Sequence, residues 1–227
     1  MYKTSKETQE RKDAKRQFIL DTAAKVFATK GYHNTTVKDI VEEASVSVGS
    51  FYFYFKSKEE LFTELYLNIV KDFQDNAEKV LDVKNYTLAK NFTRVIIANL
   101  WMYERNRDLA KIMLFEAISI NPDFKKLWNE SIKESCRTME KWFKLFKVHN
   151  PVNIPDERIA ALIFEGSFNY LINDWLESDQ SMRLTDSGYA LCIYNLQALK
   201  VPFEEEEVQR YIKEVLQELT QETIDKT

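Results

Sequence analysis

Glycine, proline and cysteine are scarce in this sequence, and it has no long uninterrupted apolar run. With 4 Gly and 4 Pro in 227 residues, the chain has too few turn residues for a collagen-like repeat, a β-sandwich or a low-complexity segment. Its two cysteines, Cys136 and Cys192, are too few and too far apart in sequence for a disulfide framework or a metal site, which favours a reducing compartment. No N-terminal signal is visible, and no stretch approaches the ~18 apolar residues of a membrane span. We therefore expect a cytoplasmic protein without a membrane partner, a metal or a cofactor.

Residues that perform common enzymatic chemistry are also scarce. The two histidines, His33 and His149, lie far from each other in the sequence and far from both cysteines. The sequence has no Ser-His-Asp order, no phosphate-binding glycine-rich loop and no HExxH motif. Paired carboxylates on one helix face occur only as solvated runs such as Glu42-Glu43. These absences predict a protein that is not an enzyme.

Charge is distributed unevenly along the chain, although the formal net charge is only −4. Residues 1–58 contain 11 Lys and Arg against 7 Asp and Glu, whereas the other 169 residues contain 21 against 29. A basic N-terminal part on an acidic body is expected of a nucleic-acid-binding module attached to a second domain. A chance excess of lysine on a solvated helix would give the same balance, so charge alone leaves both interpretations open.

Apolar residues recur at three- and four-residue steps, and no segment shows the sustained alternation of a β-strand. Thr36 and Asp39 resemble a capping box that begins a short helix, and Ser47 can cap a second short helix over 48–54. Together with the helix before them, they place three helices within residues 10–55. This pattern is typical of a helix-turn-helix.

The spacing of apolar residues in the rest of the chain predicts further helices joined by short connections. A long helix begins after Ser57, which forms a second capping box with Glu60. Others are expected at 86–105, 107–120, 122–147, 155–178, 185–200 and 204–221. Pro122 and Pro155 lie where the first turn of a helix accommodates proline, and the polar segment 178–187 is expected to be a loop. The sequence therefore predicts an all-α protein.

The segment around residues 47–58 has the chemistry of a helix that contacts DNA. If Phe51 and Phe55 are a buried i, i+4 pair, the side chains around them point outward. Serine and tyrosine hydroxyls can hydrogen-bond phosphate oxygens, and exposed valine or phenylalanine can contact thymine methyl groups. Lys58, at the start of the next helix, adds a charge suited to phosphate. An aromatic cluster packed in a core is the alternative interpretation of the same residues.

A set of residues between Arg16 and Phe62 keeps one spacing throughout. They are Ile19, Leu20, Ala23, Ala24, Phe27, Gly31, Tyr32, Thr35, Thr36, Val37, Asp39, Ile40, Ala44, Val46, Ser47, Gly49, Tyr52, Tyr54, Phe55, Lys58, Leu61 and Phe62. On these residues the segment, about a fifth of the chain, resembles the TetR family of bacterial transcriptional repressors. The resemblance implies a three-helix helix-turn-helix DNA-binding domain at 1–56 and a larger helical effector-binding and dimerisation domain at 57–227.

The resemblance also implies a function. It is that of a ligand-responsive regulator, a repressor, that binds a palindromic double-stranded DNA operator as a homodimer and is released by a small, largely apolar effector. The residues implied to contact DNA are Thr36, Lys38, Ser47, Val48, Gly49, Ser50, Tyr52, Phe53, Tyr54 and Lys58. The sequence departs from the family's pattern at Val48 and Phe53, where polar or basic residues are frequent, and at Ser45, the usual turn glycine. Base readout is therefore expected to depend on thymine contacts and on DNA shape.

The C-terminal body is rich in aromatic residues, which at helical spacing form a core more often than a pocket. We expect the effector to bind among Trp101, Tyr103, Met113, Glu116, Phe164 and Phe168. Glu116 falls on a mainly apolar stripe, where an unpaired carboxylate is costly. The alternative is a helix that is hydrophobic on two sides and whose carboxylate reaches a neighbouring lysine. Glu165 shares a strip with Asn169 and Asn173, which suits a polar surface or a pocket wall equally.

Helix 155–178 is predicted to be apolar on two sides. Phe164 and Phe168 belong to one stripe, while Ile163 and Tyr170 lie outside it. Because such a helix needs two partners, we expect it to form a four-helix dimer interface together with residues 185–200. A helical protein-interaction adaptor that does not bind DNA is the alternative to the DNA-binding regulator.

Overall fold

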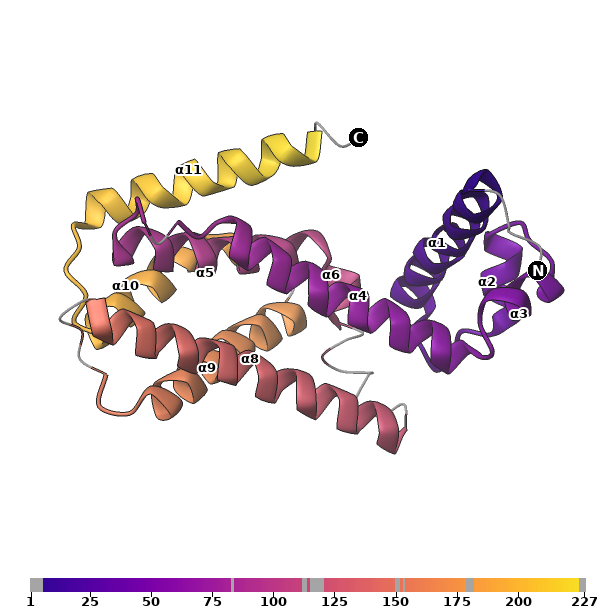
Figure 1. Cartoon of the computed structure of the whole chain (residues 1–227), viewed down its shortest axis with the longest axis horizontal. Coiled ribbons are helices and arrows are strands. Elements are labelled where there is room, and N and C mark those ends of the chain that lie inside the picture. The colour runs from indigo at the N-terminus through magenta and orange to yellow at the C-terminus, as the bar shows by residue number, and fades with distance from the viewer. Residues whose placement is uncertain are drawn as a thin grey trace. The chain divides into compact units, whose positions relative to one another are not determined.

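A computed structural model describes residues 6–82, 84–111, 114, 121–149, 152, 154–178 and 182–224 (Figure 1). Within these ranges the structure consists of helices and connections without a strand, so the predicted all-α class is confirmed. The chain divides into two compact units. The head comprises residues Met1–Val70 and Asp108–Trp128, and the body comprises Lys71–Arg107 and Asn129–Thr227.

The head begins with three helices and the first part of a fourth. They are α1 (Lys6–Lys30), α2 (Val37–Glu43), α3 (Val48–Tyr54) and α4 (Lys58–Lys79). The predicted capping box at the start of α2 is confirmed: the Thr36 hydroxyl accepts from the Asp39 backbone N–H, while the Asp39 carboxylate accepts from the Thr36 backbone N–H. The predicted cap of α3 is also confirmed, because Ser47 Oγ accepts from the Ser50 backbone N–H.

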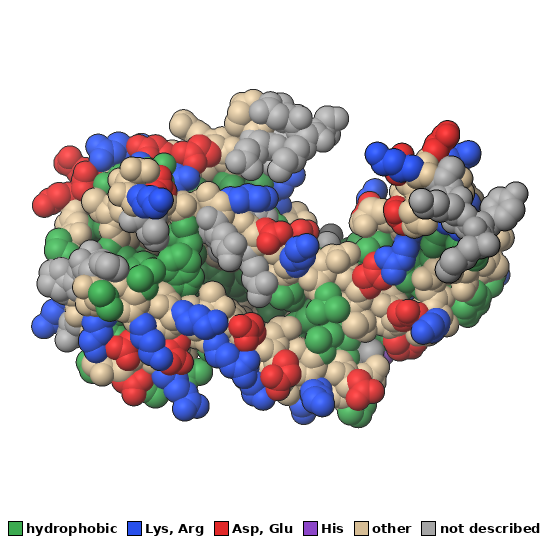
Figure 2. Space-filling view, in the orientation of Figure 1, with side chains coloured by type: hydrophobic (Ala, Val, Ile, Leu, Met, Phe, Trp, Pro, Cys, Tyr) green, Lys and Arg blue, Asp and Glu red, His purple; other side chains and the backbone are tan. Residues whose placement is uncertain are grey.

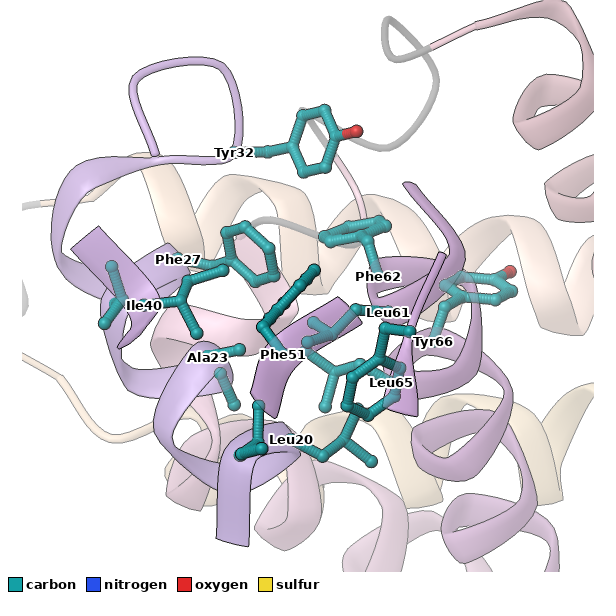
Figure 3. Close-up of a cluster of buried hydrophobic side chains, with 14 of the residues drawn as sticks. Leu20, Ala23, Phe27, Tyr32, Ile40, Phe51, Leu61, Phe62, Leu65 and Tyr66 are labelled. Atoms are coloured by element: carbon teal, nitrogen blue, oxygen red, sulfur yellow. The ribbon is translucent and has the colours of Figure 1, made fainter. Parts of the chain in front are cut away.

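The head core is built from aromatic and aliphatic side chains of all four helices (Figure 3). The Phe62 ring centroid lies 5.3 Å from that of Phe27 and 4.8 Å from that of Tyr32. Phe51 and Phe55 are both buried in this core, which confirms the predicted pair. Burying a side chain of this size contributes roughly 1.5–3 kcal/mol. These two rings therefore hold the short helix α3 against the rest of the head.

The body contains α5 (Leu88–Arg105), most of α8 (Pro122–His149), α9 (Glu157–Glu177), a 3₁₀ helix η2 (Leu184–Ser187), α10 (Gly188–Ala198) and α11 (Glu205–Ile224). Helix α5 packs against α10, η2 and α11 (Figure 1). Gly188 allows the start of α10 to approach α5 closely, because a Cβ there would lie 2.3 Å from Cδ1 of Ile97. The short helix α6 (Arg107–Lys111) follows α5.

Buried Arg94 joins three segments of the body. Its Nε donates to the carbonyl of Val80, just beyond the end of α4, at 3.0 Å, and its guanidinium pairs with Glu218 of α11. The carbonyl and the carboxylate accept hydrogen bonds from a guanidinium cation that would be costly to bury without partners. Through Arg94, α5 therefore ties the C-terminal end of α4 to the C-terminal helix.

Some predicted boundaries differ from the structure. Helix α8 begins at Pro122 as expected, but Pro155 precedes the cap of α9, because Asp156 caps this helix by accepting from the Ile159 backbone N–H. The placement of Pro155 in the first helical turn was therefore wrong. Of the predicted helix 107–120, Arg107–Lys111 is helical and most of the remainder lies outside the described residues.

The predicted loop 178–187 is wrong at its C-terminal end, where residues Leu184–Ser187 form η2. The reason is a tertiary contact: the Glu104 carboxylate of α5 accepts from both the backbone N–H and the hydroxyl of Thr185, at 2.9 and 2.8 Å. Among the helices that the structure describes, none has the length and apolar character needed to cross a membrane.

Candidate DNA-binding surface and effector site

Helix α3 leaves large apolar side chains in solvent on the side opposite its buried ring. Val48, Tyr52 and Phe53 are 49%, 55% and 66% exposed, while Phe51 is fully buried. Three such side chains on a seven-residue helix form an apolar patch of the kind that marks an interaction site. The sequence left open whether these aromatics pack in a core or face outward. The structure divides them, with Phe51 and Phe55 inside and Tyr52 and Phe53 outside.

Small and polar residues surround this patch at the start of α3. Ser47 is exposed, and a Cβ built on Gly49 would meet only the Ser47 hydroxyl, at 3.9 Å, so the backbone here is open to a partner. Ser50 is half-buried. Tyr54 packs in part against the head core and is less exposed than Tyr52.

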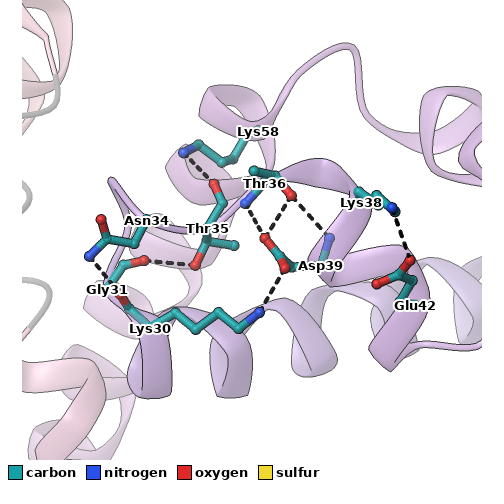
Figure 4. A network of polar contacts seen from close by, with 9 residues as sticks. All are labelled: Lys30, Gly31, Asn34, Thr35, Thr36, Lys38, Asp39, Glu42 and Lys58. Atoms are coloured by element: carbon teal, nitrogen blue, oxygen red, sulfur yellow. Dashed lines mark hydrogen bonds and ion pairs between the residues drawn. The ribbon is translucent and has the colours of Figure 1, made fainter.

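Thr36 and Lys38 lie at the beginning of α2 (Figure 4). The Thr36 hydroxyl donates to Asp39 Oδ2 at 2.6 Å, and Lys30 Nζ donates to Asp39 Oδ1 at 2.6 Å. These hydrogen bonds, from Lys30 first and then from Thr36, hold the pKa of Asp39 well below its usual value. Lys38, by contrast, has a 79% exposed side chain, and its Nζ lies 3.7 Å from Glu42 Oε1. Its ammonium group can therefore reach a phosphate without breaking a buried contact.

Lys58, the first residue of α4, is placed inside the head network. Its Nζ donates to the backbone carbonyls of Tyr32 and Thr35, at 2.8 and 2.7 Å, and lies 4.1 Å from the centroid of the Tyr32 ring. Partial burial lowers the pKa of Lys58, and the charge of the neighbouring Glu59 opposes this. The Tyr32 hydroxyl donates to Glu59 at 3.2 Å, and burial together with this carboxylate raises the pKa of Tyr32.

One basic residue beside α3 was missed by the sequence analysis. Lys12 Nζ lies 5.5 Å from the centroid of the Phe53 ring. Lys12 belongs to the N-terminal part of α1, which extends for several turns before the first buried residue, Ile19. The signal that could have found it is the continuation of helical sequence upstream of Arg16, with basic residues on successive turns.

Three of the six residues expected to bind the effector come together in the body. The ring centroids of Tyr103 and Phe168 are 6.2 Å apart, and those of Phe164 and Phe168 are 6.0 Å apart. Phe164 also contacts Phe92, at 5.5 Å. Trp101 lies on α5 with its ring 4.9 Å from the Arg105 guanidinium.

Met113 and Glu116, the other two residues expected at the effector site, lie outside the described residues. Glu165 of α9 is a half-buried carboxylate in the described part of the body. Its Oε1 accepts from Ser135 Oγ of α8 at 2.6 Å, and burial raises its pKa although this hydrogen bond opposes the shift. The Asn173 Oδ1 atom, two turns further along α9, is buried without a donor in the described part of the chain.

The other side of α9 is apolar and exposed. Ile163 and Tyr170 are 59% and 76% exposed, and a Cβ built on Gly166 between them would meet nothing within 4 Å. The members of this surface, the α9 stripe, are Ile159, Leu162, Ile163, Gly166 and Tyr170. Figure 2 shows hydrophobic side chains reaching the surface of the body among charged ones. Since Phe164 and Phe168 are buried, the prediction of a helix that is apolar on two sides is confirmed.

Comparison with known proteins places this arrangement in a family. A model of the bacterial regulatory proteins of the tetR family matches residues 19–65. The uncharacterised HTH-type transcriptional regulator YdgC of Bacillus subtilis (strain 168) is 30% identical over 168 residues, which cover 71% of this chain and 80% of that protein. The fatty acid metabolism regulator protein of the same organism is 24% identical over 171 residues, or 73% and 86% of the two chains.

A solved structure agrees with these relatives in its fold. The transcriptional regulator FadR from Bacillus subtilis, crystallised in complex with stearoyl-CoA, matches with a TM-score of 0.70 at 21% identity, over 80% of this chain and 98% of that chain. The family match and the sequence relatives identify a helix-turn-helix DNA-binding transcription regulator. The chain belongs to the TetR family, and the two relatives are named as a metabolism regulator and a transcriptional regulator.

Proposed function

We propose that this protein is a repressor that binds a palindromic operator as a homodimer and leaves it when a small, largely apolar effector binds the body. The observation that carries the DNA-binding part is the exposure of Val48, Tyr52 and Phe53 on a helix whose other side is anchored by Phe51. A rigid helix with an outward apolar and hydroxyl-bearing face can enter the major groove. The protein acts in the cytoplasm, on double-stranded DNA.

The DNA-contacting residues divide into two roles. Those that position the head on phosphates are Thr36, Lys38, Ser47, Ser50 and Tyr54, and Lys58 supports them from the start of α4. Those that read bases are Val48, Gly49, Tyr52 and Phe53. We place the DNA-binding domain at 1–56 and the effector-binding and dimerisation domain at 57–227, with the functional boundary just before α4 begins at Lys58. The compact units divide differently, within α4 after Val70, so this helix contributes residues to both.

A gel-shift titration against duplex DNA from the region upstream of its own gene tests DNA binding. Phe53→Ala and Val48→Ala should change the preferred sequence, most visibly at A·T pairs. The binding free energy that distinguishes the right from the wrong base pair should change by up to about 1–3 kcal/mol at each affected position. Lys38→Met should instead weaken binding to all sequences alike. Absence of binding to any duplex at low salt would favour the adaptor alternative.

The exposed α9 stripe supports the homodimer. An apolar helix face with a glycine at its centre allows a second helix to approach closely, and a two-fold axis would pair the stripe with itself. Tyr194 of α10 is exposed as well, so α9 and α10 from two copies can form a four-helix interface. The dimer presents two α3 helices to successive major grooves, which lie ~34–36 Å apart.

The aromatic cluster of Tyr103, Phe164 and Phe168 supports an apolar effector. We assign the site to these residues together with Trp101, Met113 and Glu116. Because a regulator of the same fold was crystallised with stearoyl-CoA, a ligand with a long acyl chain is the first effector class to test.

Tryptophan fluorescence should be titrated with stearoyl-CoA in the presence and absence of operator DNA. If the ligand weakens DNA binding, operator DNA must weaken ligand binding by the same factor. A ligand that binds with equal affinity in both conditions is not the effector. Failure of every acyl ligand to couple would reject the effector class and leave DNA binding standing.

A further inference from the structure

The connection between α1 and α2 is closed by a side chain from a helix that follows much later in the sequence. Lys58 Nζ donates to the carbonyls of Tyr32 and Thr35, which are 26 and 23 residues before it. Figure 4 shows the Lys58 side chain reaching over the connection to Thr35. One ammonium group therefore joins the start and the end of the turn that precedes the Thr36 cap.

Three further hydrogen bonds of this connection are local. The Thr35 backbone N–H donates to the Tyr32 carbonyl at 3.3 Å, the Thr35 hydroxyl donates to the Gly31 carbonyl at 2.7 Å, and the Asn34 side chain donates to the Lys30 carbonyl at 3.2 Å. None of these bonds reaches α4. The Tyr32 side chain contacts α4 as well, through its hydroxyl to Glu59 and its ring against Phe62. Lys58 attaches the other end of the turn, at the Thr35 carbonyl, to the long helix. Charge-assisted hydrogen bonds of this kind are stronger than neutral ones.

The same contacts occupy the ammonium group. Lysine has three N–H donors, and two of them are directed at backbone carbonyls. The Tyr32 ring lies against the charge at 4.1 Å from its centroid, an arrangement that favours the cation further. To contact a phosphate through more than its remaining donor, Lys58 would have to give up bonds that hold the turn.

We propose that Lys58 is a positioning residue for DNA binding, which holds the α1–α2 turn so that Thr36 and Lys38 meet the phosphate backbone, and which does not itself neutralise a phosphate. This inference rests on the proposed DNA binding. A turn without this attachment has more conformations, and DNA must then select one of them, so affinity falls with the populated fraction. The number of counterions released on binding stays the same, because no phosphate contact is lost.

Lys58→Met tests this directly, because methionine keeps an unbranched side chain and removes both the charge and the donors. We expect affinity for duplex DNA from the region upstream of the gene to fall about tenfold, which corresponds to about 1.4 kcal/mol, with an unchanged slope of log affinity against log salt. In the absence of DNA, amide hydrogen exchange over residues 31–36 should become faster. Lys58→Gln, which keeps an amide donor, should restore part of the affinity and of the protection, again at the same slope.

Lys38→Met is the matched control, since Lys38 is exposed and makes no bond to the turn. The rate of amide hydrogen exchange over residues 31–36 in Lys38→Met should equal that of the wild type. A salt slope that falls by ~1 in Lys58→Met would show a direct phosphate contact and overturn the proposal. Wild-type exchange rates over residues 31–36 in that variant would overturn it equally. If the wild type bound no duplex, the proposed function would fail, whereas hydrogen exchange would still report whether Lys58 holds the turn.

Discussion

The ammonium group of Lys12 lies 5.5 Å from the centroid of the Phe53 ring, so a charge on the first helix reaches the exposed face of α3. A contact of this kind contributes about 0.5–1 kcal/mol at an exposed site. The Phe53 side chain is 66% exposed, and its ring centroid also lies 4.9 Å from that of Tyr54. We therefore expect the proposed DNA-binding surface of the head to extend beyond the helix-turn-helix to the N-terminal turns of α1.

Replacing Lys12 tests this extension. Lys12→Met should weaken DNA binding and lower the salt slope by ~1, because a cation beside the groove-facing helix is expected to neutralise one phosphate. Binding should be measured by fluorescence anisotropy over a series of salt concentrations. Lys144→Met, an equal change of charge on α8 in the body, should leave the slope unaltered. An unchanged slope for Lys12→Met would confine the DNA surface to α2 and α3.

The α9 stripe is expected to form the dimer interface. Ile163→Asp places a charge where two copies would meet, and burying it unpaired is costly, so the variant should sediment as a monomer at micromolar concentration. Val148→Asp introduces the same charge at an exposed apolar residue of α8 and should sediment like the wild type. A wild-type protein that is already monomeric at this concentration would contradict the dimer.

Ser45 follows α2 in a left-handed backbone conformation, with φ of 51°. A side chain there is strained relative to glycine, which adopts this conformation readily. Relief of the left-handed strain, less the entropy that glycine adds to the unfolded chain, should make Ser45→Gly more stable by about 0.5–1 kcal/mol. Its Tm in differential scanning calorimetry should rise by ~1–4 °C. Lys25→Gly, at an exposed position inside α1, should lower stability by up to about 1 kcal/mol. A fall in Tm for Ser45→Gly would show that the serine side chain makes a stabilising contact.

Glu165 should make stability depend on pH. Burial raises its pKa above the ordinary value of 4.5, so the folded state binds this proton more tightly than the unfolded state does. The resulting stability is complete below pH 4.5 and is lost as pH rises through the folded-state pKa. Glu165→Gln removes the charge, so its Tm should exceed that of the wild type by more at pH 7 than at acidic pH.

The control for this prediction is Glu177→Gln, an exposed position near the end of the same helix. Its Tm difference from the wild type should stay constant across the pH range. A constant difference for Glu165→Gln as well would show that the carboxylate is better solvated than its burial against α8 implies.

The sequence by itself determined those features that depend on neighbours three or four residues away. The Thr36–Asp39 capping box, the Ser47 cap and the buried Phe51–Phe55 pair all follow from helix geometry, which brings such residues onto one face. The two apolar sides of α9 follow from the same periodicity. The match to the TetR family pattern over residues 19–65 then identified the class of protein.

Only the tertiary structure decided what depends on residues distant in the chain. Lys58 has the charge and the sequence position expected of a phosphate ligand. Its ammonium group nevertheless donates to two carbonyls that precede it by more than twenty residues. Glu104 converts part of an expected loop into η2 from 81 residues away, and Ser135 meets Glu165 across two helices. Many groups in a chain are chemically equivalent as hydrogen-bond partners of one side chain. The residues next to it in sequence therefore do not determine which of these groups it contacts. The packing of helices selects that partner, because only groups brought within bonding distance can compensate the loss of water.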